Sequence, residues 1–321
     1  MKKFLVTGGA GFIGSHIVER LLKEGHFVRV LDNFSSGKIE NLSFTHELRA
    51  KSYELIRGDI RSFDTCLKAS KGIDFILHQA ALRSVPKSMR NPQEYNEVNI
   101  QGTLNLLKAA VKNKIKCFVL ASSSSVYGEI KVFPEKEGFL PQPISPYALT
   151  KLAGEHYCRI FSYYHRLPTL SLRYFNVFGP RQSLDDEYAV VIPKFINCLL
   201  KGEHPPIYGT GKQSRDFTYV KNVAEANLLA VKKMNSKGEV FNVASGKDYT
   251  VLELVKILHK IMDKDTKPNF LPLRPGDVFK TQADLSKIKR MLGYKPKIDF
   301  IQGLKLTVEY FGKKWVGKRP L

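Results

Sequence analysis

A tyrosine and a lysine stand four residues apart in the middle of the chain, at a spacing that could support proton transfer. They follow Ser145, which suits a helix N-cap, and Pro146, which suits the first helical position. On such a helix Tyr147 and Lys151 share one face, one turn apart. A free phenol has a pKa of about 10, and a nearby ammonium would lower that pKa by favouring the phenolate. Tyr147 is therefore a candidate general base.

Hydroxyl side chains precede this pair at the end of a predicted strand. The apolar run 116–121 leads into four consecutive serines, Ser122 to Ser125. A serine at a strand end could hold the reacting hydroxyl or carbonyl oxygen of a substrate. A Tyr-x-x-x-Lys match alone is more typical of a surface helix, so its functional interpretation depends on these serines and on the start of the chain.

Glycines interrupt the first apolar run and lead into a predicted helix. Residues 4–6 have strand character, glycines stand at 8, 9, 11 and 14, and apolar residues recur at helical spacing over 15–22. Glycines permit the turn and let the backbone approach a phosphate, which the free N–H groups and dipole of the new helix attract. This strand–turn–helix context is the one that a dinucleotide-binding motif requires.

An acidic residue stands where a dinucleotide ribose would be recognised. The second predicted strand, 27–31, ends at Asp32, about 20 positions after the glycine turn. A carboxylate there would accept hydrogen bonds from the adenosine ribose and repel a 2′-phosphate, which favours NAD over NADP; a turn aspartate is the structural alternative. A cationic nicotinamide ring would add to the effect of Lys151 on the pKa of Tyr147.

Strands alternate with helices through the first half of the chain. We predict strands at 4–6, 27–31, 53–57, 75–78, 116–121 and 168–174, with helices that include 102–113 and 146–164. This alternation predicts an α/β fold with a Rossmann-type, doubly wound parallel sheet, whose ligands bind at the carboxyl ends of the strands.

Beyond Asn176 the pattern loosens into short pieces broken by proline and glycine. Helices are predicted at 220–234 and 250–262, with a strand at 239–243 between them. We therefore predict a dinucleotide-binding domain over 1–176 and a smaller, mixed C-terminal substrate domain over 177–321, with the provision that parts of 218–245 can pack on the first.

Composition narrows the classes of partner. The 321 residues are 43% hydrophobic, with no apolar run close to a membrane span of about 20 residues. The net charge is +21, but its lysines are scattered, which favours a polyanionic small substrate over nucleic acid. Four separated cysteines indicate buried, reduced thiols and no metal site. With no secretory segment after Met1, we expect a cytoplasmic protein.

Several motifs occur together in an order that resembles one enzyme family. They are Thr7–Gly14, Gly58–Ile60, His78–Ala81, Ser122–Gly128, Tyr147–Lys151, Arg173–Gly179, Ser214–Phe217 and Arg274–Asp277. Few are distinctive singly. In this order, over nearly the whole length, the chain resembles extended short-chain dehydrogenases/reductases, and among them the nucleotide-sugar 4-epimerases, particularly those that act on UDP-N-acetylhexosamines.

The resemblance implies a role for individual residues. For catalysis it implies Ser123, Tyr147 and Lys151. For NAD it implies Gly8, Gly11, Phe12, Ile13, Gly14, Asp32, Asn33, Asp59, Ile60, Ala80, Ala81, Arg83, Asn99, Tyr147, Lys151 and Tyr174, although an exposed arginine is an equal interpretation of Arg83. For the UDP-sugar it implies Ser84, Ser123, Ser125, Tyr147, Asn176, Val191, Tyr208, Arg215, Arg274, Asp277 and Thr281. Arginines suit the UDP phosphates because guanidinium groups bond phosphate oxygens bidentately.

The implied reaction inverts C4 of the sugar without net oxidation. Tyr147 would take the proton of the 4-hydroxyl while C4 gives hydride to bound NAD, and hydride would return to the other face of the 4-keto sugar. The resemblance also implies a homodimer, with the UDP-sugar as the small-molecule partner.

Departures from the family pattern separate its members. Dehydratases carry an Asp-Glu pair directly after the catalytic hydroxyl, where this chain has Ser124 and Ser125. Epimerases restricted to unacetylated sugars carry a bulky aromatic residue near the aligned position of Thr281. We therefore expect activity on UDP-GlcNAc and UDP-GalNAc, with UDP-glucose and UDP-galactose as further substrates.

Two alternatives stay open. A UDP-uronate 4-epimerase or decarboxylase would share the 4-keto intermediate. A non-catalytic NAD-binding regulator would use the glycine turn, but it would have no use for Tyr147 together with Lys151.

Overall fold

A parallel sheet of seven strands forms the centre of the computed structural model, which describes residues 1–47, 52–183, 191–233, 235–273 and 278–316. Its strands lie in the order β11-β6-β5-β4-β1-β2-β3, and every neighbouring pair is parallel. Their bounds are β1 Lys3–Thr7, β2 Phe27–Asp32, β3 Tyr53–Arg57, β4 Phe75–His78, β5 Cys117–Ser123, β6 Thr169–Tyr174 and β11 Lys237–Val243. The order reverses between β1 and β4, which opens a crevice at their carboxyl ends. The predicted doubly wound α/β fold is confirmed.

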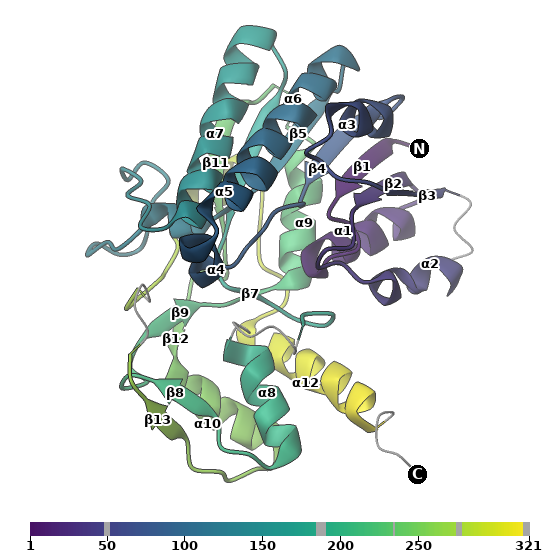
Figure 1. The fold of residues 1–321 in the computed structure, drawn as a ribbon. Coiled ribbons are helices and arrows are strands. Elements are labelled where there is room, and N and C mark those ends of the chain that lie inside the picture. Colours follow the sequence, from purple (N-terminus) through teal and green to yellow (C-terminus); the bar gives the residue numbers. More distant parts are fainter. Residues whose placement is uncertain (48–51, 184–190, 234, 274–277, 317–321) are drawn as a thin grey trace.

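Helices cover both faces of this sheet (Figure 1). One face carries α1 Phe12–Lys23, α9 Val220–Ala230 and α11 Ser286–Leu292, and the other carries α3 Phe63–Ser70, α6 Gly102–Lys112 and α7 Pro146–His165. Side chains alternate between the two faces along each strand. Phe4 and Val6 pack with the α1 and α9 side, whereas Leu5 packs with the α3 and α6 side.

Short elements form the connections at the carboxyl edge of the sheet. They are η1 Ile39–Leu42, α2 Phe44–Glu47, α4 Val85–Arg90, α5 Pro92–Tyr95, the π-helical turn η2 Asn96–Gln101 and the 3-10 turn η3 Ser124–Tyr127. Connections at this edge surround any ligand of a doubly wound sheet, and residues of α4, α5, η2 and η3 line the cavities described below.

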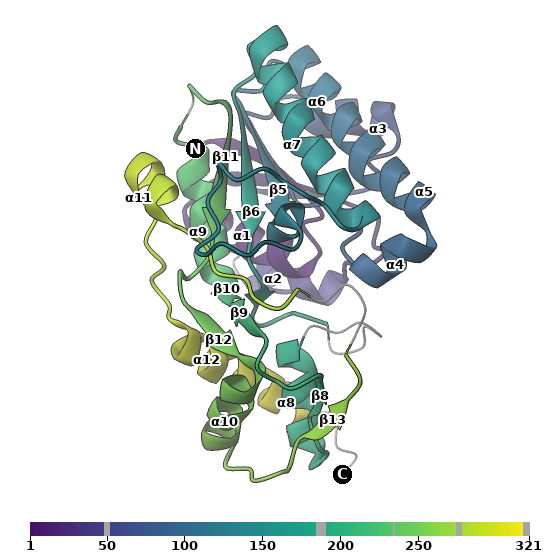
Figure 2. The same ribbon diagram turned by 90° about the vertical axis from the view of Figure 1, so that its left-hand side faces the viewer.

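A second, smaller unit lies below the carboxyl edge (Figure 2). Its elements are β7 Val177–Phe178, α8 Val191–Lys201, β8 Pro206–Tyr208, β9 Ser214–Asp216, β10 Thr218–Tyr219, β12 Asp248–Thr250, α10 Val251–Met262, β13 Asn269–Leu271 and α12 Phe300–Val316. The strands pair two by two, as β10 with β7, β12 with β9, and β13 with β8. A separate apolar core that includes Phe178, Phe195, Leu254 and Phe300 holds α8, α10 and α12 together.

The strand predicted at 239–243 lies in the main sheet. Its position in the chain puts this strand in the second predicted domain, although we expected that parts of 218–245 could pack on the first. In the structure β11 pairs with β6 at the edge of the seven-stranded sheet. The helix α9 ends at Ala230, earlier than the predicted 234, and contacts α1. The chain therefore returns to the first unit after it has built part of the second.

The four cysteines are buried, and the described helices are too short or too polar to span a membrane. Cys66, Cys117, Cys158 and Cys198 are all buried and carry no disulfide. No helix in the described part of the chain is long and apolar enough to cross a bilayer.

Candidate active site

The turn between β1 and α1 admits only glycine at two positions. Gly8 has a φ of +65°, and a Cβ added there would lie 2.7 Å from the Ala80 nitrogen. A Cβ on Gly14 would lie 2.1 Å from the Gly8 carbonyl oxygen. The helix α1 then begins after Gly11 with no side-chain cap. Its first N–H groups are therefore available to an anion, as a phosphate-binding turn requires.

A cavity of about 230 Å³ opens over this turn. The structure brings the following predicted cofactor residues to its wall: Gly8, Gly11, Phe12, Ile13, Gly14, Asp32, Asn33, Asp59, Ile60, Ala80, Ala81, Arg83, Tyr147, Lys151 and Tyr174. They come from the ends of several strands, which parallel pairing places along one edge. Gln79, Arg61 and Glu94 also line the cavity and were not predicted.

Asn99 does not line this cavity, in contrast to the prediction from the resemblance. It is 3% exposed, and its Oδ1 accepts from the Leu82 N–H at 2.8 Å. Its Nδ2 donates to the Leu82 carbonyl at 2.9 Å and to Thr150 Oγ1 at 3.0 Å. Asn99 thus fixes the backbone of Leu82, which does line the cavity, and ties that backbone to α7.

Two carboxylates hold defined positions at the cavity wall. Asp32 is buried, and its carboxylate accepts from the Ala10 N–H at 2.9 Å and the Phe34 N–H at 2.8 Å. Asp59 accepts from Asn33 Nδ2 at 2.9 Å and pairs with Arg61 at 2.8 Å. Hydrogen bonds from Arg61 are the largest cause that lowers the pKa of Asp59 to about 2. Asp59 therefore stays ionised at neutral pH.

Lys151 is fixed behind Tyr147 at the end of β5. As predicted, the Ser145 side chain caps α7 by accepting from the Ala148 N–H. The Lys151 ammonium donates to the Ala121 carbonyl at 2.9 Å and lies 5.9 Å from the centre of the Tyr147 ring. Burial lowers the pKa of Lys151 to about 8. The lysine is still mostly protonated at neutral pH.

The pKa of Tyr147 differs from the expectation based on spacing. Burial raises it above the ordinary value, and a hydrogen bond with Ser123 and the positive charge of Arg83 only partly oppose that effect. The protein groups alone therefore do not turn Tyr147 into a base at neutral pH.

A buried ion pair fixes the helix that carries both catalytic candidates. Arg173 on β6 donates to the Glu155 carboxylate on α7 at 2.7 and 2.9 Å, and both side chains are less than 5% exposed. Ser122 Oγ at the end of β5 donates to the same carboxylate. The serine-bearing strand end and the Tyr147–Lys151 helix are thereby held in one arrangement.

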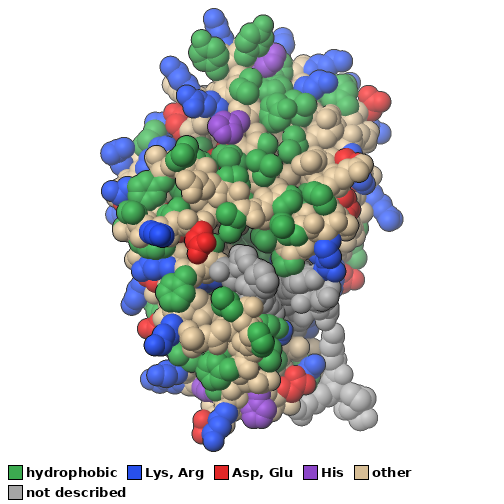
Figure 3. Space-filling model, turned by 60° about the vertical axis from the view of Figure 1, so that its left-hand side comes forward, with side chains coloured by type: hydrophobic (Ala, Val, Ile, Leu, Met, Phe, Trp, Pro, Cys, Tyr) green, Lys and Arg blue, Asp and Glu red, His purple; other side chains and the backbone are tan. Residues whose placement is uncertain are grey.

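A second cavity of about 350 Å³ lies between the sheet and the smaller unit, where Figure 3 shows a hollow. The predicted substrate residues at its wall are Ser125, Asn176, Val191, Tyr208, Arg215 and Thr281. Ser123 is 8% exposed and donates to Ser125 Oγ at 3.0 Å, so it stands behind this wall. Ser84 instead caps α4, next to the lining residue Val85. Arg274 and Asp277 lie outside the described residues.

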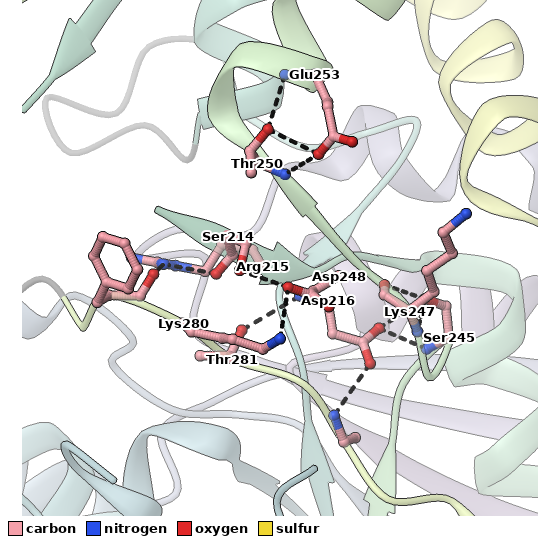
Figure 4. Close-up of polar contacts among 12 residues, drawn as sticks. Ser214, Arg215, Asp216, Ser245, Lys247, Asp248, Thr250, Glu253, Lys280 and Thr281 are labelled. Carbon is pink, nitrogen blue, oxygen red and sulfur yellow. Dashed lines mark hydrogen bonds and ion pairs between the residues drawn. The ribbon is translucent and has the colours of Figure 1, made fainter. Parts of the chain in front are cut away.

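Hydrogen bonds between neighbouring segments hold the wall that carries Arg215 and Thr281 (Figure 4). Asn176 Nδ2 donates to Thr281 Oγ1 at 2.9 Å, and Arg215 donates to the Ser214 carbonyl at 2.9 Å. The fully buried Asp216 carboxylate accepts from the Ser245 N–H, the Ser245 hydroxyl and the Gly246 N–H at 2.7–2.9 Å. Burial is the main cause that raises the pKa of Asp216 to about 6. Asp216 thus holds β9 in place for Arg215.

Five polar residues of this cavity were not predicted as substrate contacts, namely Ser124, Glu135, Ser145, Lys194 and Gln213. Lys194 on α8 lies 5.5 Å from the centre of the Tyr208 ring, and Gln213 donates to the Tyr208 carbonyl at 2.6 Å. Glu135, in the segment between η3 and α7, also lines the wall. Lys194 stands in an apolar helix next to the predicted Val191, which is the one signal that could have indicated it.

The two cavities meet at the serine-tipped end of β5. Ser122, Tyr147 and Lys151 line the first, while Ser124 and Ser125 line the second. A ligand in each cavity would therefore come together at Ser123 and Tyr147. The arrangement suits proton transfer to or from a hydroxyl group between a dinucleotide and a second ligand.

Comparison with known proteins finds one family over most of the chain. A family model described as "NAD dependent epimerase/dehydratase family" matches residues 4–244. The chain is also similar to the UDP-N-acetylglucosamine 4-epimerase of Methanobrevibacter ruminantium, solved in complex with UDP-N-acetylmuramic acid. That likeness has 43% identity and a TM-score of 0.93, over 98% of this chain and 99% of the other.

Two further solved structures are similar over nearly the whole chain. The UDP-glucose 4-epimerase of Thermotoga maritima with UDP-glucose shows 41% identity and a TM-score of 0.92, over 98% of this chain and 99% of that one. The UDP-glucuronic acid 4-epimerase of Bacillus cereus, with UDP-glucuronic acid and NAD, shows 36% identity and a TM-score of 0.89, over 97% and 99%.

Proposed function

Because this chain belongs to the NAD-dependent epimerase/dehydratase family, we propose that it is a UDP-sugar 4-epimerase that works with tightly bound NAD. The observation that carries the proposal is the position of Tyr147, which lines the cavity over the glycine turn close to a second cavity that contains Arg215. The substrates are UDP-GlcNAc and UDP-GalNAc, together with UDP-glucose and UDP-galactose.

The first cavity fits NAD on its own geometry. Gly8 and Gly14 let the turn pack closely against its neighbouring backbone, where a Cβ would clash, and Asp32 stands at the end of β2 to accept from the adenosine ribose. Asp59 and Ile60 would flank the adenine, and Ala80 and Ala81 would lie by the nicotinamide. Bound NAD would supply the hydride acceptor and donor for C4 of the sugar.

The protein groups at the junction move the proton and hold the oxygen. The Tyr147 hydroxyl takes the proton of the sugar 4-hydroxyl and later returns it, and the Ser123 hydroxyl holds the same sugar oxygen. Because burial raises the pKa of Tyr147, a positive charge on the bound cofactor is needed to favour the phenolate.

The second cavity is suited to bind UDP firmly while it makes fewer contacts with the sugar. Arg215 and Asn176, with Arg274, would bond the diphosphate and its neighbours. Thr281 is small, which leaves room for a 2-acetamido group. An epimerase needs this division, because the sugar must present both faces at C4 while UDP stays bound.

A UDP-uronate 4-epimerase is the second candidate, favoured by the likeness to the Bacillus cereus enzyme. Dehydration is disfavoured because Ser124 and Ser125 stand where dehydratases carry an acidic pair. A purely regulatory protein is disfavoured because it would not require Tyr147 and Lys151 together at the junction.

Incubation of the purified protein with UDP-GlcNAc and no added NAD is expected to yield UDP-GalNAc of unchanged mass. Retained NAD explains why none need be added, since the cofactor is regenerated in each turnover. Chromatography with mass detection checks the result, with UDP-glucose, UDP-glucuronate and UDP-N-acetylglucosaminuronate in parallel. Loss of 44 mass units would instead reveal a decarboxylase, and absence of any product would refute the epimerase proposal.

The same proposal includes a cytoplasmic homodimer. Leu149, Ile160 and Tyr164 share one side of α7 and are 53%, 55% and 78% exposed. Hydrophobic side chains also gather over this part of the molecule in Figure 3. Exposed apolar surface of this kind is typical of a protein interface.

Ile160→Asp is expected to convert a dimer into monomers, because a charge at an apolar interface must be desolvated. Light scattering coupled to gel filtration measures the mass of the species in solution. Ile39→Asp, which changes an equally exposed isoleucine on η1, serves as the control and should leave the dimer intact. A monomeric wild-type protein would contradict this part of the proposal.

A further inference from the structure

A carboxyl group with an unsatisfied oxygen lies in the wall of the 350 Å³ cavity. Glu135 is 2% exposed and lines that cavity. Within the described residues its Oε2 atom has no hydrogen-bond partner. Buried polar atoms almost always have partners, and an unsatisfied one is costly. The missing partner is therefore best explained as a group that arrives with the ligand.

Backbone contacts fix Glu135 beside Thr281. Its N–H donates to the Gln282 carbonyl at 2.6 Å, and its carbonyl accepts from the Asp284 N–H at 2.8 Å. A parallel bridge pairs Glu135 with Ala283, so their side chains project to the same face. Thr281, two residues before Ala283, lines the same cavity as Glu135. The carboxyl group and the side chain that we expect to leave room for the sugar 2-substituent therefore belong to one cavity wall.

This part of the cavity is its sugar end. Ser124 and Ser125 line the same cavity and follow the end of β5, where Ser122, Tyr147 and Lys151 line the neighbouring cavity. Because Tyr147 must reach the oxygen on C4, the sugar ring has to lie against these serines. The groups carried by the ring then face the wall that contains Glu135 and Thr281.

We propose that Glu135 is a specificity-determining residue, which hydrogen-bonds the sugar through its carboxyl group and disfavours a uronate once that group has lost its proton. The inference rests on the proposed UDP-sugar site. Hydroxyl and acetamido N–H groups can donate the hydrogen bond that Oε2 lacks. A uronate carboxylate can accept the proton of a neutral Glu135, but it has no proton to donate to the ionised form and adds a second negative charge. Glu135 thus separates the two candidate substrate classes.

The charges around Glu135 give this selection a pH dependence. The charges that act on it come from Asp216 and Arg215 on β9 and from Arg173 on β6. Burial is the largest cause that raises the pKa of Glu135 to about 8, a hydrogen bond with the Gln282 backbone lowers it, Asp216 raises it, and both arginines lower it. A substrate carboxylate acts as Asp216 does, so a uronate binds well only while Glu135 keeps its proton. Uronate affinity should therefore fall as the pH rises through about 8.

The test compares dissociation constants for UDP-glucuronate and UDP-GlcNAc at pH 7 and pH 9, by calorimetry on the NAD-loaded protein. Lys151 and Tyr147 titrate in Glu135→Gln as they do in the wild type, so comparison of the variant with the wild type isolates the effect of Glu135. In the wild type, discrimination against the uronate should grow about tenfold between these pH values, since the protonated fraction of a group with a pKa of about 8 falls by about that factor. In Glu135→Gln the ratio should be the same at both pH values.

A second variant separates a sugar contact from a structural role. Glu135→Leu should weaken UDP-GlcNAc binding about tenfold and leave UDP binding within twofold, because UDP carries no sugar for Glu135 to contact. Equal loss for UDP and UDP-GlcNAc, or a wild-type ratio that does not change with pH, would overturn the proposal. These are binding measurements, so a protein that binds both nucleotide sugars without epimerising them would refute the proposed activity and still decide the role of Glu135.

Discussion

Tyr147→Phe is expected to lower kcat for UDP-GlcNAc epimerisation by about 10²- to 10⁴-fold, the range of a positioned general acid–base group. The substitution removes only the hydroxyl of a side chain that lines the first cavity, close to the serines that line the second. The ring, which packs edge-on against Tyr95 with centroids 6.5 Å apart, stays in place. NAD content and UDP affinity should therefore change little, so the loss should fall on kcat and much less on KM.

Tyr163→Phe provides a matched control for this measurement. Tyr163 stands on the same helix but is 88% exposed. Removal of its hydroxyl should leave kcat within twofold of the wild type. If Tyr147→Phe kept a tenth or more of the wild-type kcat, the assignment of Tyr147 as general base would be wrong. Such a result would direct attention to Ser123 as the proton carrier.

Gly14→Ala is expected to abolish NAD retention and to lower the free energy of unfolding by roughly 1–3 kcal/mol, as overpacking does. The new Cβ would lie 2.1 Å from the Gly8 carbonyl oxygen and 2.8 Å from the Gly9 Cα. Both are backbone atoms of the turn, so the contact can be relieved only by moving the turn away from the start of α1. That movement removes the position in which the helix N–H groups face the pyrophosphate.

Absorbance of the nucleotide released on denaturation measures the NAD content of the purified variant, and denaturant unfolding measures its stability. Gly138→Ala is the control, because a Cβ at Gly138 has no atom within 4 Å and its φ is not in the left-handed region. This variant should keep its NAD and its wild-type stability. NAD retained in full by Gly14→Ala would contradict the fit of the cofactor to this turn.

The cofactor side of the site could be predicted closely because its determinants are local in sequence. The glycine turn follows one strand, and the acidic residue ends the next. Alternating strands and helices form a parallel sheet, so both motifs lie along the same edge of that sheet. Residues as far apart as Gly8, Asp32 and Tyr174 therefore lie around one cavity. Their roles toward NAD stay predictions. Asn99 does not line the cavity; its side chain hydrogen-bonds the backbone of Leu82, which does.

The substrate side could not be predicted in the same way, because long-range contacts assemble it. Glu135 reaches the cavity only through its pairing with Ala283, almost 150 residues away in the chain. The pKa of Tyr147 likewise depends on burial, which the Tyr-x-x-x-Lys spacing does not reveal. The place of β11 in the main sheet depends on the return of the chain after the second unit has begun.

Because β11 follows part of the second unit in the chain and pairs in the main sheet, no single cut in the gene separates the two units. A fragment that ends at Asn176 would lack β11 and leave the fully buried strand β6 as an exposed edge, ready to pair with another copy. The substrate-binding half is therefore not an exchangeable module that can be grafted at a single junction. New sugar specificity in this chain has to arise through individual side chains along the cavity, within a scaffold that folds as a whole.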